Sequence, residues 1–155
     1  TGPDAAFGLA VQNDGRIITT GSTGLAGAER VPVARYNSDG SLDTTFSGDG
    51  RLTINMTAGY EDATSVVVLD DGRILVAGEA NDRVGLARFM PGGEPDGTFS
   101  TDGRQITNLP GSVEYASVVR LQADDRIVIS GSISGQTIGR FHSPCMRTRC
   151  AGSTR

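Results

Sequence analysis

One segment of this chain occurs twice at a fixed spacing. Residues 34–46 read Ala-Arg-Tyr-Asn-Ser-Asp-Gly-Ser-Leu-Asp-Thr-Thr-Phe, and residues 87–99 read Ala-Arg-Phe-Met-Pro-Gly-Gly-Glu-Pro-Asp-Gly-Thr-Phe, aligned without a gap. A third copy begins with Gly-Arg-Phe at residues 139–141 and departs from the pattern from His142 onward. Self-similarity at a period of about fifty residues is typical of repeat architectures, so the chain is predicted to consist of tandem units.

Each unit opens with the pattern of a β-hairpin. Runs of β-prone residues flank the turns at residues 13–15 (Asn-Asp-Gly), 70–72 (Asp-Asp-Gly) and 123–125 (Ala-Asp-Asp). Asn, Asp and Gly tolerate the positive φ that such tight turns need. Further strands are predicted at residues 31–36, 84–89 and 137–141, and then at residues 50–54 and 103–107.

Four short antiparallel strands per unit predict an all-β fold made of β-propeller blades. The predicted division is a first blade at residues 1–62, a second at 63–115, a partial third at 116–142 and a flexible tail at 143–155. Composition agrees with strands and tight turns, because Gly accounts for 22 of the 155 residues and no window shows the apolar period of a helix.

The repeat resembles the bacterial delta-60 repeat family. Units of that family carry a hairpin similar to residues 71–78 (Asp-Gly-Arg-Ile-Leu-Val-Ala-Gly) and a segment similar to residues 34–46. The resemblance covers roughly residues 5–141, and it implies a β-propeller in a secreted or cell-surface protein with no general enzymatic activity. The first residues lack a basic start followed by an apolar core, so no signal peptide is predicted in the chain.

The number of units raises the question of how a ring would close. Propellers have about four to eight blades, and an open arc of three would leave sheet faces and strand edges exposed. We expect two copies to close head to tail into a six-bladed homodimeric ring with two-fold symmetry. Two alternatives stay open at this point: the chain is a piece of a longer propeller, or residues 143–155 supply a makeshift edge strand.

Charge and hydropathy narrow the choice of partners. The net charge of −4 argues against a nucleic-acid module, which should present a basic face. No apolar run approaches the roughly 18 residues that a membrane-spanning helix needs. The predicted partner is a second copy of the chain, which follows from the closure of the ring, and a small-molecule ligand is a further candidate.

A carboxylate occurs at one repeat position, just before the first strand of each unit. These residues are Asp4, Glu61 and Glu114. Equivalent positions of successive blades surround the central channel, so the three side chains are predicted to form a ring at one mouth. Such a ring could bind a divalent cation (Ca, Mg or Zn) through oxygen ligands. The alternative is that these carboxylates cap turns or solvate the rim.

The connection between the second and third strands varies in length among the units, which marks a loop on a binding face. Its charged residues in the second unit, Glu79, Asp82 and Arg83, are therefore predicted to bind a ligand together with the channel-mouth carboxylates. Glu29 and Arg30 occupy the corresponding connection of the first unit.

Most of the remaining charged residues recur from unit to unit, which favours structural roles. The acids after the third strand are predicted to accept backbone N–H bonds in turns and to pair with repeated arginines. The acids are Asp39, Asp43, Asp49, Asp96 and Asp102, and the arginines are Arg16, Arg73, Arg126, Arg35, Arg88 and Arg140. Phe46 and Phe99 are predicted to be plugs within or between blades.

No catalytic motif of comparable strength is present. His142 is the sole histidine, which excludes a His-rich zinc site within one chain, and the two cysteines lie in the tail at positions 145 and 150. The leading hypothesis is a non-catalytic propeller module that is structural or binds a ligand. The alternative is a metal-dependent hydrolase of esters or phosphoesters, in which a cation held by the ring of carboxylates activates water.

Overall fold

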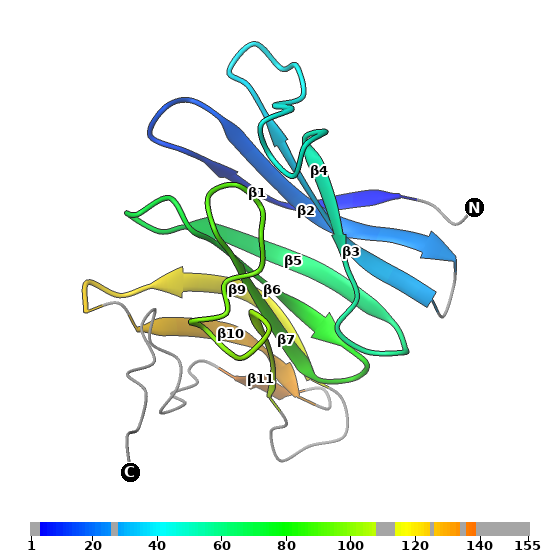
Figure 1. Cartoon of the computed structure of the whole chain (residues 1–155). Coiled ribbons are helices and arrows are strands. Elements are labelled where there is room, and N and C mark those ends of the chain that lie inside the picture. Colours follow the sequence, from blue (N-terminus) through cyan, green and yellow to red (C-terminus); the bar gives the residue numbers. More distant parts are fainter. Residues whose placement is uncertain (1–3, 26–27, 108–113, 125, 134–135, 139–155) are drawn as a thin grey trace.

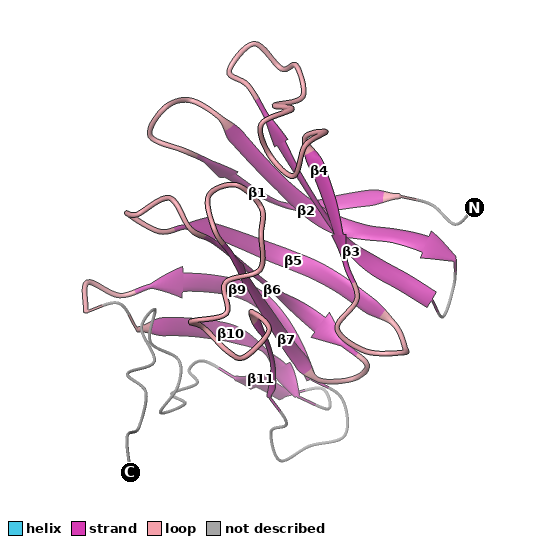
Figure 2. Ribbon diagram, in the orientation of Figure 1, coloured by secondary structure: helices cyan, strands magenta, loops and turns pink. Residues whose placement is uncertain are grey.

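The described part of the chain is entirely made of β-strands, turns and loops. A computed structural model describes residues 4–25, 28–107, 114–124, 126–133 and 136–138. No helix occurs among them (Figures 1 and 2), and hence none that could cross a membrane. The strands are β1 (Ala5–Val11), β2 (Ile17–Leu25), β3 (Ala28–Tyr36), β4 (Arg51–Ile54), β5 (Glu61–Val68), β6 (Ile74–Ala80), β7 (Val84–Phe89), β8 (Arg104–Thr107), β9 (Glu114–Leu121), β10 (Ile127–Ile133) and β11 (Gln136–Ile138).

The strands form three antiparallel sheets in chain order. Sheet 1 has the order β1-β2-β3-β4, sheet 2 the order β5-β6-β7-β8, and sheet 3 the order β9-β10-β11. The all-β prediction and the hairpin at the start of each unit are confirmed. Gly15 and Gly72 have φ of 83° and 82°, as the predicted turns require. The blade boundaries stay a prediction, and the tail at 143–155, His142 and the end of the third strand at 139–141 lie outside the described residues.

The connection between the second and third strands differs from the prediction. In sheet 1 the paired strands continue through the segment predicted as a loop, with Thr23 opposite Arg30 and Gly24 opposite Glu29. In sheet 2 the pairing extends to Glu79 opposite Val84. The variation in length predicted a loop in each unit, but most of the connection in the first unit is strand, whereas in the second unit residues 81–83 form the turn.

A β-bulge in the first strand of each sheet faces a glycine in the second strand. The register shifts between Ala6 and Gly8 in β1, with equivalent shifts in β5 and β9. A Cβ atom at the facing glycine would lie 1.7–2.1 Å from a carbonyl oxygen of the first strand; these glycines are Gly21, Gly78 and Gly131. Only glycine fits, because any side chain would overlap the bulged backbone.

This contact predicts that Gly78→Ala lowers the free energy of unfolding by about 1–3 kcal/mol, the usual range for overpacking. The Cβ would meet the carbonyl oxygen of Asp62 at 2.1 Å, so the backbone must move. Urea unfolding followed by circular dichroism measures the loss. Gly97→Ala is the matched control, since its Cβ would meet nothing nearer than 3.8 Å. Equal stability of the two variants would contradict the account.

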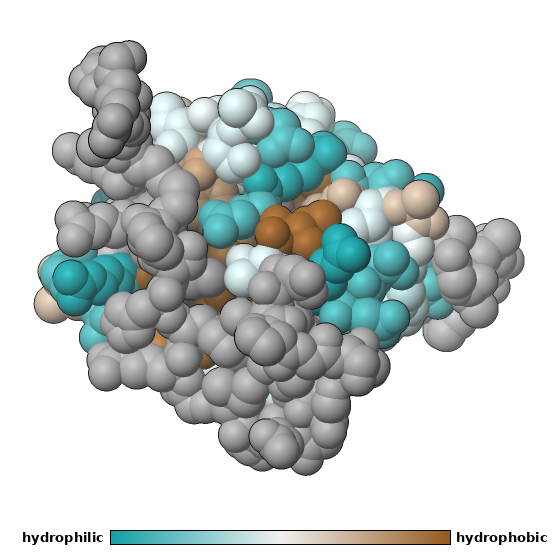
Figure 3. Space-filling view, turned by 90° about the horizontal axis from the view of Figure 1, so that it is seen from below, coloured by the Kyte–Doolittle hydropathy of each residue, from teal (hydrophilic) through white to brown (hydrophobic). Residues whose placement is uncertain are grey.

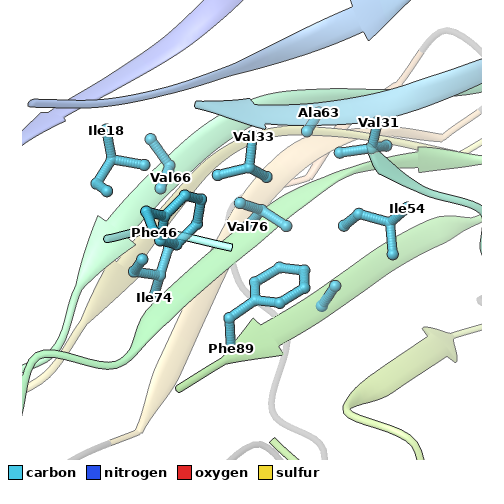
Figure 4. Packing of buried hydrophobic residues seen from close by; sticks show 11 residues of the cluster. Ile18, Val31, Val33, Phe46, Ile54, Ala63, Val66, Ile74, Val76 and Phe89 are labelled. Carbon is cyan, nitrogen blue, oxygen red and sulfur yellow. The ribbon is translucent and has the colours of Figure 1, made fainter. Parts of the chain in front are cut away.

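The three sheets stack face to face, with sheet 2 in the middle (Figure 1). Between sheets 1 and 2 a core forms from Ile18, Val31, Val33, Phe46, Ile54, Ala63, Val66, Ile74, Val76, Ala87 and Phe89 (Figure 4). Between sheets 2 and 3 a second core forms from Leu69, Leu75, Ala77, Val84, Leu86, Phe99, Ala116, Val119, Ile127 and Ile129. Because both faces of sheet 2 are covered, its strands β6 and β7 are buried along their whole length.

Candidate functional site

The repeated segment folds into a buried turn built on one ion pair. After β3 the chain returns so that the backbone N–H of Asp43 donates to the carbonyl of Arg35 at 2.9 Å. The Asp43 carboxylate then accepts from Arg35 Nε at 2.7 Å and lies 3.1 Å from Arg16 Nε. Its other oxygen accepts from the backbone N–H and the hydroxyl of Thr45 at 3.0 and 2.6 Å. Each carboxylate oxygen thus has partners, which allows an ion pair to be buried.

The second unit repeats this geometry nearly atom for atom. Asp96 accepts from Arg88 Nε at 2.7 Å and from Arg73 at 3.1 Å. It also accepts from the backbone N–H and the hydroxyl of Thr98 at 2.9 and 2.6 Å. Burial acts to raise the pKa of Asp96, but the bonds from Thr98 and Arg73 and the charge of Arg88 outweigh it and lower the pKa to about 2. The predicted pairing of repeated arginines with these acids is confirmed in both units.

Each arginine of the pair also stacks on the phenylalanine that ends the segment. The guanidinium carbon of Arg35 lies 4.9 Å from the ring centre of Phe46, and that of Arg88 lies 4.7 Å from the ring centre of Phe99. These distances are those of cation–π contacts. Both rings are buried in the cores between sheets, which confirms their prediction as plugs and places them between blades.

The turn of the first unit also binds the turn of the second unit. Arg35 Nη1 donates to the carbonyl of Pro91 at 2.6 Å, and the backbone N–H of Ser47 donates to the carbonyl of Gly92 at 2.8 Å. Gly93 lies against the ring of Phe46, where a Cβ would be 3.0 Å from the ring edge. The turn after β3 of the first unit therefore contacts the second unit through hydrogen bonds and an aromatic ring.

The other acids of these loops act as predicted, by stabilising turns. Asp39, Asp49 and Asp102 each accept the backbone N–H of the residue two positions later, at 2.9–3.0 Å. The acids at the hairpins behave in the same way: Asp14 and Asp71 accept from Arg16 and Arg73. Among the described residues, these carboxylates are thus engaged in local backbone bonds.

The structure gives the predicted channel-mouth carboxylates different surroundings. Asp4 is exposed and accepts a bond from the hydroxyl of Thr23. Glu61 is fully buried and caps the preceding loop, because its Oε1 accepts the backbone N–H groups of Met56, at 2.7 Å, and Thr57. Glu61 Oε2 has no hydrogen-bond partner among the described residues. For Glu61 the geometry is that of the turn-capping alternative.

The ring of three carboxylates stays a prediction. Glu114 is the first residue of β9, and its side chain lies outside the described part of the chain. Among the side chains that are described, no three His, Cys, Asp or Glu residues form a group that could hold a metal ion.

The second predicted set, Glu79, Asp82 and Arg83, lies at the turn between β6 and β7. Asp82 and Arg83 are exposed, whereas Glu79 is only 5% exposed and accepts the backbone N–H of Asp82 at 3.3 Å. Burial, followed by the charges of Asp62 and Asp82, raises the pKa of Glu79 to about 7, although the backbone bond from Asp82 opposes the shift. The ligand-binding role of these residues stays a prediction.

The raised pKa of Glu79 makes stability depend on pH. Between about pH 4.5 and about pH 7 the folded chain holds a proton on Glu79 that the unfolded chain has lost. The contribution of Glu79 to stability therefore falls as the pH rises through this window. The original protein should lose roughly 2 kcal/mol of this contribution to the free energy of unfolding between about pH 5 and about pH 8. Glu79→Gln has no such proton to lose, so its free energy of unfolding relative to that of the original protein should rise by the same amount. Glu94→Gln, at an exposed glutamate, is the matched control, and a pH-independent difference for Glu79→Gln would contradict the assignment.

Two structural features escaped the reading of the sequence. The bond from Arg35 to the Pro91 carbonyl has no signal in the sequence, because a backbone acceptor can belong to any residue type. The glycines that face the bulges do have a signal in the sequence, because they recur at one repeat position. Each lies five residues after the arginine that follows the hairpin turn; they are Gly21, Gly78 and Gly131.

Comparison with known proteins agrees with the geometry of stacked sheets. A family model described as a β-propeller domain of unknown function, DUF5122, matches residues 12–46 and 69–99. The two matched segments run from the hairpin turn of a unit to its buried phenylalanine. Neither the curated proteins nor the solved structures contain a match to the chain. The repeats are therefore similar to those of β-propellers.

Proposed function

We propose that the chain is a non-catalytic structural module that supplies consecutive blades to a β-propeller ring. The observation that carries the proposal is the twofold occurrence of one buried assembly, Arg35–Asp43–Phe46 and Arg88–Asp96–Phe99. A catalytic group is needed once in an active site, whereas a contact between blades is needed at every blade. The repeated charged residues are engaged in holding turns and sheets together.

We further propose that the ring is closed by a second copy of the chain, which gives six blades and two-fold symmetry. Three observations support a series of blades that continues into a ring: the sheets stack in one direction, each through the same kind of face, and the family match is to a β-propeller. A head-to-tail contact closes into a ring when its rotation permits, and a six-bladed ring lies within the usual range of propellers.

The non-catalytic proposal is tested by assays of ester and phosphoester hydrolysis with Ca²⁺, Mg²⁺ or Zn²⁺ added. We expect no turnover above that of the buffer with the same ion. Turnover that Glu61→Gln abolishes, while circular dichroism shows the fold intact, would contradict the proposal. Asp102→Asn, at an exposed carboxylate of a turn, is the matched control for the loss of one charge.

A further inference from the structure

The outer face of sheet 1, which points away from sheet 2, exposes apolar side chains at positions that are buried in the other sheets. Leu9, Val66 and Val119 are equivalent, since each lies seven residues before the arginine that follows the hairpin turn. Val66 is 4% exposed and Val119 is 0% exposed, because each packs against the preceding sheet. Leu9 is 63% exposed. The same side chain position is thus a core position twice and a surface position once.

The neighbours of Leu9 show the same contrast. Val11, two residues further along β1, is 64% exposed. Ile17 is half-buried, whereas its equivalents Ile74 and Ile127 are fully buried. Leu9, Val11 and Ile17 therefore form an apolar surface that matches the face through which sheet 2 receives sheet 1.

A groove of about 480 Å³ runs along this outer face. Among the residues that line it are Thr19, Ala34 and Tyr36 of β2 and β3. Their equivalents in sheet 2 are Val76, Ala87 and Phe89, which belong to the core between sheets 1 and 2. The groove of sheet 1 thus lies where sheet 2 is covered by the preceding blade.

The turn of the first unit is equivalent to the turn of the second unit that contacts the preceding unit. In the second unit, the carbonyls of Pro91 and Gly92 accept bonds from the first unit, and Gly93 contacts Phe46. The equivalent residues are Ser38, Asp39 and Gly40. A Cβ at Gly40 would meet nothing within 4 Å, where one at Gly93 would meet Phe46 at 3.0 Å. The turn at residues 38–40 thus leaves room for a preceding blade to make the contacts that the first unit makes with the second.

We infer that the outer face of sheet 1 is the surface that binds a second copy of this chain, with Leu9 among its exposed apolar residues. This inference rests on the proposed function, because the second copy is the one that closes the ring. The contact continues the series of two interfaces within the chain. Seen from below, the described residues include apolar ones among polar ones (Figure 3).

The sequence of the third unit bears on the strength of this contact. The third unit does not repeat the Asp-x-Thr-Phe sequence after residue 141. The contact therefore has no counterpart of the Phe46 ring, and we expect it to be weaker than the contacts within the chain and dependent on concentration.

The inference is tested with Leu9→Arg, studied by light scattering over a range of concentrations. Leu9→Arg places a charge on the exposed surface, so we expect it to stay at the mass of one chain while keeping the circular dichroism spectrum. Ile106→Arg is the matched control, since Ile106 is 37% exposed on the outermost strand of sheet 2, and it should associate as the original protein does.

The outcomes separate this inference from the proposed function. If the original protein forms a dimer and Leu9→Arg still forms it, the assigned surface is wrong and the six-bladed ring can stand. If the original protein has the mass of one chain at every concentration, both the ring of two copies and this inference fail. A dimer that Leu9→Arg abolishes and Ile106→Arg retains supports both.

Discussion

Arg88→Met is expected to lower the free energy of unfolding by about 3–5 kcal/mol, the usual cost of removing one partner from a buried ion pair. The side chains of Arg88 and Asp96 are 0% and 1% exposed, and their Nε and Oδ2 atoms are 2.7 Å apart. Methionine fills much of the volume of arginine but leaves the Asp96 carboxylate buried with a weaker set of donors. A domain of this size has a total stability of about 5–15 kcal/mol, so the loss is a large fraction of it.

Urea unfolding followed by circular dichroism measures this loss, and the design separates charge burial from a general effect of losing arginine. Arg51→Met is the matched control at an exposed position and should change stability by less than about 0.5 kcal/mol. The double variant Arg88→Met with Asp96→Leu should recover part of the loss, because the unpaired carboxylate is then gone. A stability of Arg88→Met equal to that of Arg51→Met would show that the pair does not hold the turn.

Phe46→Ala is expected to cost about 3–5 kcal/mol, the range for truncating a buried aromatic side chain. Phe46 is fully buried and lies among Ile18, Val66 and Ile74, which come from sheets 1 and 2 (Figure 4). The substitution removes the ring on which Arg35 stacks and leaves a cavity between two sheets. Since the ring belongs to the first unit and its pocket largely to the second, the variant weakens the contact between blades.

The test for Phe46 compares unfolding curves with those of Met90→Ala, which truncates an apolar side chain that is 42% exposed. Met90→Ala should lie within about 0.5 kcal/mol of the original protein. Limited proteolysis adds a second readout, because a weakened contact between sheets 1 and 2 should open the loop at residues 55–60 to cleavage. An unfolding midpoint for Phe46→Ala that matches Met90→Ala would contradict the role of Phe46 as a wedge between blades.

The repeat allowed much of the fold to be predicted from the sequence. The turns at Gly15 and Gly72 follow from local conformational preference, and the pairing of Arg35 and Arg88 with Asp43 and Asp96 follows from their repetition. Phe46 and its repeat could be recognised as buried because a large apolar residue recurs within a polar loop. These features depend on residue type and spacing, which a sequence displays directly.

The candidate site was less predictable, because burial depends on which elements meet in space. Glu79 was predicted at an exposed binding loop, but β6 extends to Ala80 and carries Glu79 into the sheet, where burial raises its pKa to about 7. Glu61 shared a repeat position with Asp4, yet it caps the loop before β5 while Asp4 is exposed. Equivalent positions in the sequence therefore have different surroundings, because the conformation of the neighbouring loop determines whether the side chain is buried.

The mass of the chain in solution tests most directly the claim that these blades belong to a ring completed by a second copy. Light scattering at increasing concentration should show the mass rising from 16.1 kDa toward twice that value. Dimer formation is expected to be reversible, since the third unit lacks a counterpart of Phe46 and Phe99, which pack between the sheets within the chain. A constant mass of 16.1 kDa across the whole range would contradict the six-bladed ring of two copies.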